Sequence, residues 1–361
     1  MENEVTTKIK NWINQPRKIP LSQKIFFVQQ LEVMLKAGIS LSAALKTLSQ
    51  QTTSKSFKII LNDLQKSVEK GNLLSKGLEN HRKIFSELFI NMIKAGEVAG
   101  KLEEVLKQLF IQMKKDHEII SKVKGAMIYP AIVITMMVAI GILVLAYVIP
   151  TMSGVFTEMD VQLPLPTRVL IGLSEIVLNY GIYILVAALI IAAVFTRTIS
   201  LPKGKKIFHQ ILLKIPIIGS IIKKINIARF CRTLSSLLKT DIPIVQSFEI
   251  TAKVLGNMEY KNSLLEAREK IKKGVGIRDS LSRYLNLFPP VILQMISVGE
   301  ETGTLDNILE ESAMFYEEEV SQTMNNLPSI LEPVLMVILG LGVGGMAVAV
   351  IMPMYSLSQQ I

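Results

Sequence analysis

Three long uncharged stretches divide the chain and predict three membrane-spanning helices. They cover residues 125–157, 176–196 and 333–361. A helix needs roughly 20 apolar residues to cross the ~30 Å hydrocarbon core of a bilayer, so each stretch is long enough. A buried helix of a soluble domain rarely runs that far without a charged residue. We therefore place the spans at residues 129–150, 176–196 and 332–354.

The composition agrees with this interpretation. Only 19% of the 361 residues are charged and half are hydrophobic, whereas a soluble domain carries about 25% charged residues. A single cysteine, Cys231, excludes a disulfide framework, and three histidines argue against a Cys/His metal centre. Residues 1–20 are polar and lack the apolar core of a signal peptide, so we expect insertion through the internal spans.

The distribution of lysine and arginine predicts the orientation. Four lysines precede the first span, and the loop at 151–175 contains a single basic residue, Arg168. Seven basic residues and no acidic residue lie between the second span and position 228. Positive residues collect on the cytoplasmic side, so we expect the N-terminus and residues 197–331 in the cytoplasm. The 151–175 loop and the 355–361 tail are then external.

The two predicted cytoplasmic regions repeat each other. A shift of 203 residues aligns them without a gap over about 100 positions. An ungapped match of this kind indicates duplication of one folded unit. The matched pairs include Leu31 with Leu234, Lys36 with Lys239, Gly71 with Gly274, Phe85 with Phe288, Met92 with Met295, and Pro130 with Pro333.

Each repeat reads as a helical bundle. Apolar periodicity predicts helices at 24–36, 42–51, 55–70, 85–95 and 102–124, separated by breaks at Gly38, Gly71 and Gly96. Alternation typical of strands is hard to find. We therefore predict an all-α membrane protein with an N-terminal segment (1–25), two helical repeats (26–128 and 229–331) and a basic linker (197–228). The order is bundle, span, span, bundle, span.

One motif, G-E-x-x-G-x-L, occurs at the same place in both repeats. Its glycines permit positive φ, so the first can end a helix and the second can open the turn into the next. The glutamate can cap free backbone N–H groups, or it can form an acidic corner that docks a partner. Both roles stay open. The motif residues are Gly96, Glu97 and Gly100 in the first repeat, and Gly299, Glu300 and Gly303 in the second.

In combination these features resemble the type II secretion F family. The features are the doubled bundle, the two corners, the Tyr129-Pro130 and Glu332-Pro333 pairs, and the 163–170 run, and the resemblance covers residues 20–356. It implies a scaffold in the bacterial inner membrane, acting as a homo-oligomer with other inner-membrane assembly proteins. This scaffold would lie between a cytoplasmic assembly ATPase and a fibre of pilin or pseudopilin subunits. A pilus, a secretion machine and a DNA-uptake machine all fit.

The residues predict no enzyme, no cofactor and no catalytic or metal-binding site. A phosphate-binding loop of the G-x-x-x-x-G-K-[ST] type is absent. The glycine-rich run at 340–345 lies inside the third span, where Gly340 and Gly344 are expected to allow close helix packing. A transporter or permease subunit is the alternative function, but it needs polar groups along its spans. A signalling protein would need a phosphoacceptor, for which His117 is the candidate.

Charge suggests further contacts. Glu332 precedes the third span, where it is solvated, paired, or in contact with a cationic group of a pilin or a neighbouring copy. Residues 26–128 hold 16 basic and 10 acidic residues, and residues 229–331 hold 11 and 14. The two repeats could pair through this difference, or the charges could be solvated. The basic 197–224 stretch fits a membrane flank near anionic lipid better than nucleic-acid binding.

Overall fold

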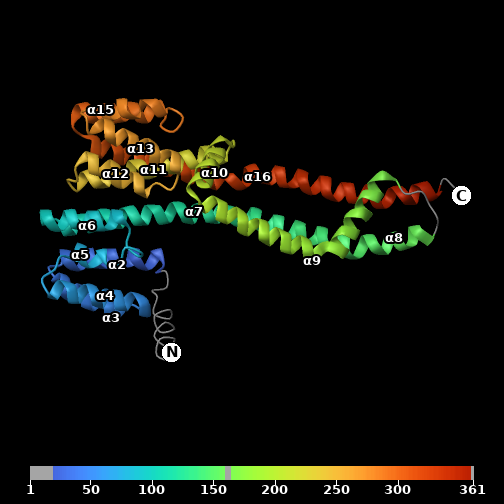
Figure 1. The fold of residues 1–361 in the computed structure, drawn as a ribbon, viewed down its shortest axis with the longest axis horizontal. Helices are drawn as coiled ribbons and strands as arrows, with labels where there is room; N and C mark the ends of the chain where they lie inside the picture. Colours follow the sequence, from blue (N-terminus) through green and yellow to red (C-terminus); the bar gives the residue numbers. More distant parts are fainter. Residues whose placement is uncertain (1–18, 159–163, 359–361) are drawn as a thin grey trace. The chain divides into compact units, whose positions relative to one another are not determined.

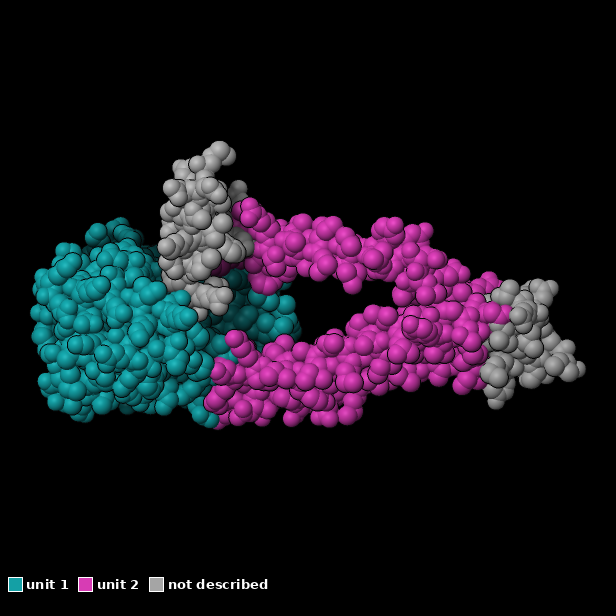
Figure 2. Space-filling view, turned by 90° about the horizontal axis from the view of Figure 1, so that it is seen from below, with its two compact units in different colours: residues 1–120, 209–320 teal, residues 121–208, 321–361 magenta. Residues whose placement is uncertain are grey.

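The structure, a computed structural model, describes residues 19–158 and 164–358, and every regular element in these ranges is a helix (Figure 1). Contacts divide the chain into two compact units: residues 1–120 with 209–320, and residues 121–208 with 321–361 (Figure 2). Unit 1 contains both repeats, and unit 2 contains the apolar parts of the spans. Each unit is described by itself.

The two repeats use the same order of helices. Repeat 1 comprises α2 (Leu21–Lys36), α3 (Leu41–Gln51), α4 (Lys55–Glu69), α5 (Leu74–Glu79), α6 (Glu87–Ala99) and the start of α7 (Leu102–Leu143). Repeat 2 comprises α11 (Ile218–Lys239), α12 (Ile244–Val254), α13 (Met258–Ile271), α14 (Ile277–Leu281), the 3₁₀ turn η2 (Ser282–Tyr284), α15 (Pro290–Thr302) and the start of α16 (Leu305–Ser358).

Matching aromatic clusters form the two cores. In repeat 1, the ring of Phe27 lies 5.6 Å from Phe57 and 6.1 Å from Phe85. At the positions 203 residues later, the ring of Phe288 lies 5.2 Å from Phe230 and 5.4 Å from Tyr260. Three of these four pairs are edge-to-face, a geometry that adds about 0.5–1.5 kcal/mol per pair to the burial of the rings. The duplicated sequence thus encodes a duplicated core.

The backbone repeats even where the residue does not. Gly71 and Gly274 follow α4 and α13 with φ of +79° and +85°. Gly38, after α2, has φ of +78°, and the residue 203 positions later is Asp241, with φ of +59°. Aspartate tolerates the left-handed region better than most residues. In this case its carboxylate also reaches the Lys101 ammonium, at 3.1 Å.

The helices extend beyond the predicted boundaries. α7 and α16 run without a break from the repeats into the spans, with Pro130 and Pro333 inside them. The prediction that residues 151–175 form a loop is wrong, because the helices α8 (Ile149–Glu158) and α9 (Leu165–Ser200) occupy most of this segment. The 197–228 linker is also helical, through α10 (Pro202–Lys214) and the start of α11. The short helices α5 and α14 were not predicted, because six and five residues are too few to show periodicity.

Three helical stretches are long and apolar enough to cross a membrane. They are Leu102–Gly154, Leu165–Ile199 and Leu305–Met352. Their apolar windows are almost wholly uncovered by the rest of the chain, and Figure 2 shows an opening between the helices of unit 2. A Cβ added at Gly340 or Gly344 would meet nothing within 4 Å. The predicted close packing at these glycines is therefore not made within the described part of this chain.

Hydroxyl groups of α9 serve two backbone carbonyls that prolines leave without a donor. The π-helical turn η1 (Val144–Val148) pairs residues five apart, and Pro150 cannot donate to the Leu145 carbonyl. Ser174 donates to that carbonyl instead, at 2.5 Å. Pro353 likewise cannot serve the Ala349 carbonyl in α16, which accepts from Thr167 Oγ1 at 2.6 Å. Unpaired carbonyls are costly in hydrocarbon, so these bonds hold the helix ends together.

Exchange of Thr167 for valine should therefore destabilise unit 2. The isosteric change removes the donor but keeps the volume, and a hydrogen bond of this kind between membrane helices contributes about 0.6–1.7 kcal/mol. The loss should appear as a lower resistance to denaturing detergent. Thr135→Val is the control, because its hydroxyl bonds only the Ala131 carbonyl of its own helix. Equal resistance of the two variants would contradict this role of Thr167.

Candidate partner-docking corners and the seam between the repeats

The two motif glutamates hold the N-termini of the short helices. The Glu97 carboxylate accepts hydrogen bonds from the backbone N–H groups of Leu74 and Ser75, the latter at 2.9 Å. The Glu300 carboxylate accepts from Ile277 at 2.6 Å and Arg278 at 3.0 Å. Each glutamate therefore caps a helix that begins 23 residues earlier in the chain, and not the helix at its own corner. A carboxylate at a helix N-terminus satisfies orphan donors and the helix dipole together.

The two glycines of each motif do not both have the roles that the sequence predicted. Gly96 and Gly299 do not end a helix; they are buried inside α6 and α15. A Cβ on Gly96 would lie 2.7 Å from Val105 Cγ2, and one on Gly299 would lie 2.9 Å from Leu305 Cα. Each glycine therefore lets the following helix approach closely. The helices end at Gly100 and Gly303, whose φ values are +67° and +71°.

Neutralising the motif glutamates should loosen the short helices. In Glu97→Gln, one carboxylate oxygen becomes an NH₂ group facing a backbone N–H, so one charge-assisted bond is lost. Such bonds contribute about 1.5–3 kcal/mol when partly buried, and the more exposed Glu300 should lose less than Glu97. Hydrogen exchange of the α5 and α14 amides is the measurement. Glu311→Gln, on the exposed surface of α16, should leave the exchange unchanged; protected α5 amides in Glu97→Gln would refute the capping role.

Glu332 lies in α16 within unit 2 and is exposed. Among the described residues it makes no hydrogen bond or ion pair. Its carboxylate is therefore free for a partner, and its docking role stays a prediction. The same described ranges contain no cluster of three or more His, Cys, Asp or Glu side chains that could hold a metal ion.

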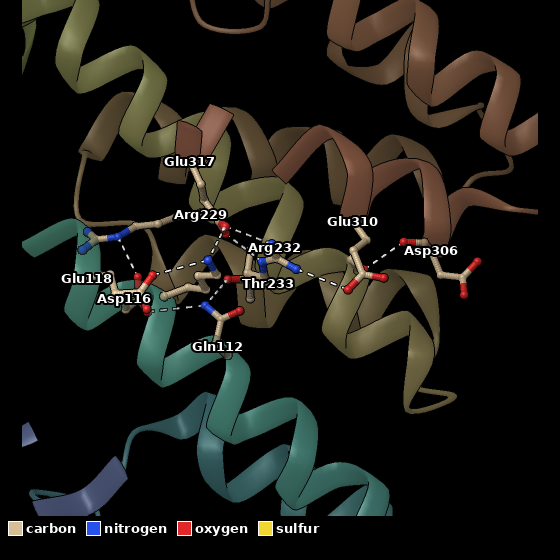
Figure 3. Close-up of polar contacts among 11 residues, drawn as sticks. Gln112, Asp116, Glu118, Arg229, Arg232, Thr233, Asp306, Glu310 and Glu317 are labelled. Atoms are coloured by element: carbon tan, nitrogen blue, oxygen red, sulfur yellow. Dashed lines mark hydrogen bonds and ion pairs between the residues drawn. The ribbon is translucent and has the colours of Figure 1, made fainter. Parts of the chain in front are cut away.

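Helix α11 carries a charged network that the sequence did not predict (Figure 3). Arg232 is 6% exposed and donates two hydrogen bonds to Glu317 of α16, from Nε to Oε1 at 2.8 Å and from Nη2 to Oε2 at 3.0 Å. Glu310, about two turns before Glu317 on α16, accepts from Arg232 at 3.4 Å and also from Lys239. Bidentate, buried geometry makes the Arg232–Glu317 pair strong and specific. Together these pairs fix α11 against α16.

An adjacent face of α11 is fixed to α7 of repeat 1. Asp116 accepts from Arg229 Nε at 3.0 Å, and Gln112 donates to Thr233 Oγ1 at 3.3 Å (Figure 3). Lys115 of α7 also approaches Glu317, at 3.8 Å. α7 and α16 are the two helices that continue into spans. Helix α11 is therefore bonded to both within unit 1.

The repeats pair, as the charge difference suggested, but without a simple division of sign. Repeat 1 supplies the acid to Arg229 and, through Glu87, to Lys253 at 2.7 Å. It supplies the base to Asp241 through Lys101. Apolar packing accompanies these pairs, because Leu237, Ile242 and Ile250 of repeat 2 join the hydrophobic core of repeat 1. The interpretation that these charges are merely solvated is wrong for the pairs named.

Sequence reasoning did not identify the residues that bond the two repeats to each other, because most of them differ between the repeats. The positions of repeat 1 that correspond to Arg229 and Arg232 are Phe26 and Gln29, and the position of repeat 2 that corresponds to Gln112 is Phe315. Positions where one copy is charged and the other is not were the signal available.

Comparisons with known proteins match both halves of the chain. The model of the family "Type II secretion system (T2SS), protein F" matches residues 27–150 and again 230–353, ranges offset by the same 203 residues. Type IV pilus assembly protein PilC of Myxococcus xanthus is 34% identical over 334 residues, which cover 92% of this chain and 80% of the relative. PilC of Thermus thermophilus is 33% identical over 337 residues, covering 93% and 83%.

A secretion protein is similarly close. Type II secretion system protein F of Aeromonas hydrophila is 30% identical over 363 residues, which cover 99% of this chain and 93% of the relative. The names of these relatives describe assembly and secretion components, not enzymes or permeases. The resemblance seen in the sequence is thus confirmed. This chain belongs to the type II secretion system protein F family and is a multi-pass membrane component of bacterial pilus or secretion machinery.

Proposed function

We propose that the protein is the inner-membrane platform that couples a cytoplasmic assembly ATPase to extrusion of pilin-like subunits. One observation carries the coupling: α7 and α16 pass unbroken from the repeats into apolar spans, and α11 is bonded to both, to α16 by a buried ion pair and to α7 by a partly buried one. A displacement applied to the repeats would then reach two spans through continuous helices. The chain supplies the scaffold, and nucleotide chemistry belongs to the ATPase.

The proposed orientation places both repeats in the cytoplasm and the 151–175 segment outside. It is supported by the lysines before the first span and the basic stretch after the second. Reporter fusions test it. A phosphatase active only outside the membrane should be inactive when fused after Arg197 and active when fused near Arg168. The reverse pattern would refute the orientation.

We propose that the two motif corners dock the ATPase. Glu97→Lys with Glu300→Lys should abolish co-purification of the ATPase with the platform. Because these carboxylates also cap helices, the Gln variants of the same positions serve as the control for lost caps without reversed charge. A third variant, Val98→Ser with Glu301→Gln, changes exposed corner residues and leaves both caps intact. Intact ATPase binding in the charge-reversed variant would end the docking role.

Glu332 is proposed to meet a cationic group of a pilin-like subunit in the same membrane. Its exposure and lack of a described partner support this role. A photo-crosslinker placed at Val334, an exposed neighbour on α16, should capture pilin, and Glu332→Gln should reduce the yield. Capture of a second copy of the platform instead would reassign the contact to the homo-oligomer.

A further inference from the structure

Helix α10 begins immediately after a membrane span. The uncharged stretch of α9 ends at Thr196, α9 itself continues past Arg197 to Ser200, and only Leu201 separates it from Pro202, the first residue of α10. Pro202 therefore follows the uncharged part of the span by six residues, about 9 Å along a helix. Chain connectivity keeps the start of α10 near the bilayer surface.

One side of α10 is bonded to the protein. The Phe208 ring packs edge-on against Phe195 of α9, with centroids 5.9 Å apart. His209 Nδ1 accepts from the Met258 N–H at 3.0 Å, and Gln210 donates to Glu259 at 3.1 Å. Leu213 packs on the core of repeat 2. These contacts fix the rotation of α10 about its own axis.

The other side of α10 presents large apolar side chains that nothing described covers. Ile207 and Ile211, one turn apart, are 58% and 54% exposed, and Leu201 before them is 57% exposed. The exposed apolar surface continues into the corner after α10 through Ile215, Ile217 and Ile218. A run of exposed isoleucines of this size marks an interaction surface.

Lysines accompany these isoleucines. Lys206 and Lys214 are exposed and Lys205 is half-buried, and no acidic residue occurs from Arg197 to Ala228. A helix with isoleucines on one face and lysines beside them matches the interfacial helices that lie in the plane of a membrane. Lysine stems can cover apolar surface while their ammonium groups reach the phosphates.

We propose that α10 is an interfacial helix that lies on the bilayer, with Ile207 and Ile211 among the acyl chains and its lysines bound to anionic phospholipid headgroups. Two observations select this occupant: continuity with a membrane span, and a charge of one sign. The inference needs only the span, so it stands or falls separately from the platform function.

Spin labelling of the full chain in lipid nanodiscs tests the proposal. The native Cys231 is buried, and burial raises the pKa of its thiol, so it does not compete for the label. Single labels go on Ile207→Cys and Ile211→Cys. The matched control is Ile59→Cys in α4, an isoleucine 62% exposed on repeat 1. We expect the α10 labels to be more accessible to oxygen than to a nickel chelate, and the Ile59 label to show the opposite order.

Lipid composition tests the charge. In nanodiscs containing phosphatidylglycerol the α10 labels should lie deeper than in phosphatidylcholine alone, and Lys205→Gln/Lys206→Gln/Lys214→Gln should remove that difference. Labels on α10 as accessible to the chelate as the Ile59 label would overturn the proposal. Spin–spin broadening at Ile207 would overturn it too, because it would show a second copy covering this face.

Discussion

Exchange of Arg232 for methionine is expected to lower the free energy of unfolding by about 3–5 kcal/mol, the usual effect of removing one member of a buried ion pair. The Glu317 side chain is only 9% exposed and would lose its bidentate partner. Lys115, at 3.8 Å, is too distant to replace two hydrogen bonds. Methionine fills most of the arginine volume, so the loss reports the charge and not a cavity. Denaturant unfolding of the purified protein in detergent is the measurement.

Two controls separate the buried pair from surface charge. The double variant Arg232→Met/Glu317→Leu removes both charges and should recover much of the loss, because a buried pair replaced by apolar residues is often neutral or better. Arg82→Met breaks an exposed pair with Glu79, which should change stability by less than about 1 kcal/mol. If Arg232→Met unfolds like Arg82→Met, the Arg232–Glu317 pair does not hold α11 against α16.

The same network bears on function. A variant that unfolds normally but has α11 released from α16 would uncouple the repeats from the third span under the proposed mechanism. The double variant Arg232→Met/Glu317→Leu provides this separation, because its stability should be close to that of the original chain. If the pair has only a structural role, cells that carry this variant should still assemble fibres. If the pair couples the repeats to the span, fibre assembly should be lost.

Much of the architecture could be predicted because it depends on local patterns. The spans follow from uninterrupted apolar runs, and the bundle helices from the 3.6-residue stripe that starts at Leu102. The duplication was visible because core aromatics such as Phe85 and Phe288, and positive-φ glycines such as Gly71 and Gly274, repeat with the fold. Asp241 shows the limit of this signal, because the conformation at the Gly38 position is kept without the glycine.

What could not be predicted depends on contacts between distant residues. The motif suggested that Glu97 caps a helix, but α5, the helix it caps, is a single short turn too small to show periodicity. Arg229 and Arg232 form pairs with α7 and α16, and no spacing rule connects residues more than 80 positions apart. The motif glycines are the intermediate case: Gly100 and Gly303 have the positive φ that the motif predicted, whereas Gly96 and Gly299 do not end a helix as predicted.

Those two glycines give the second large expected effect. Gly299→Ala should destabilise the protein by about 1–3 kcal/mol, the usual cost of overpacking, although alanine favours a helix by about 1 kcal/mol relative to glycine. The new Cβ would lie 2.9 Å from Leu305 Cα, a backbone atom at the start of α16, and 3.0 Å from Leu305 Cδ1. α16 would have to move away from α15. Gly125→Ala in α7 is the control, because its Cβ would meet nothing within 4 Å, and it should be neutral or stabilising.

Gly96→Ala is the corresponding change at the first corner, where the close contact is with a side chain and not with backbone. Its Cβ would meet the Val105 side chain, at 2.7 Å from Cγ2 and 3.0 Å from Cβ. Removal of Cγ2 by Val105→Ala should therefore offset part of the Gly96→Ala cost, so that the two changes together destabilise less than their sum. Ile308→Ala should rescue Gly299→Ala far less, because the atom in the way there is backbone. Additive effects at Gly96 and Val105, measured by thermal unfolding, would mean that α6 and α7 are not in close contact at this corner.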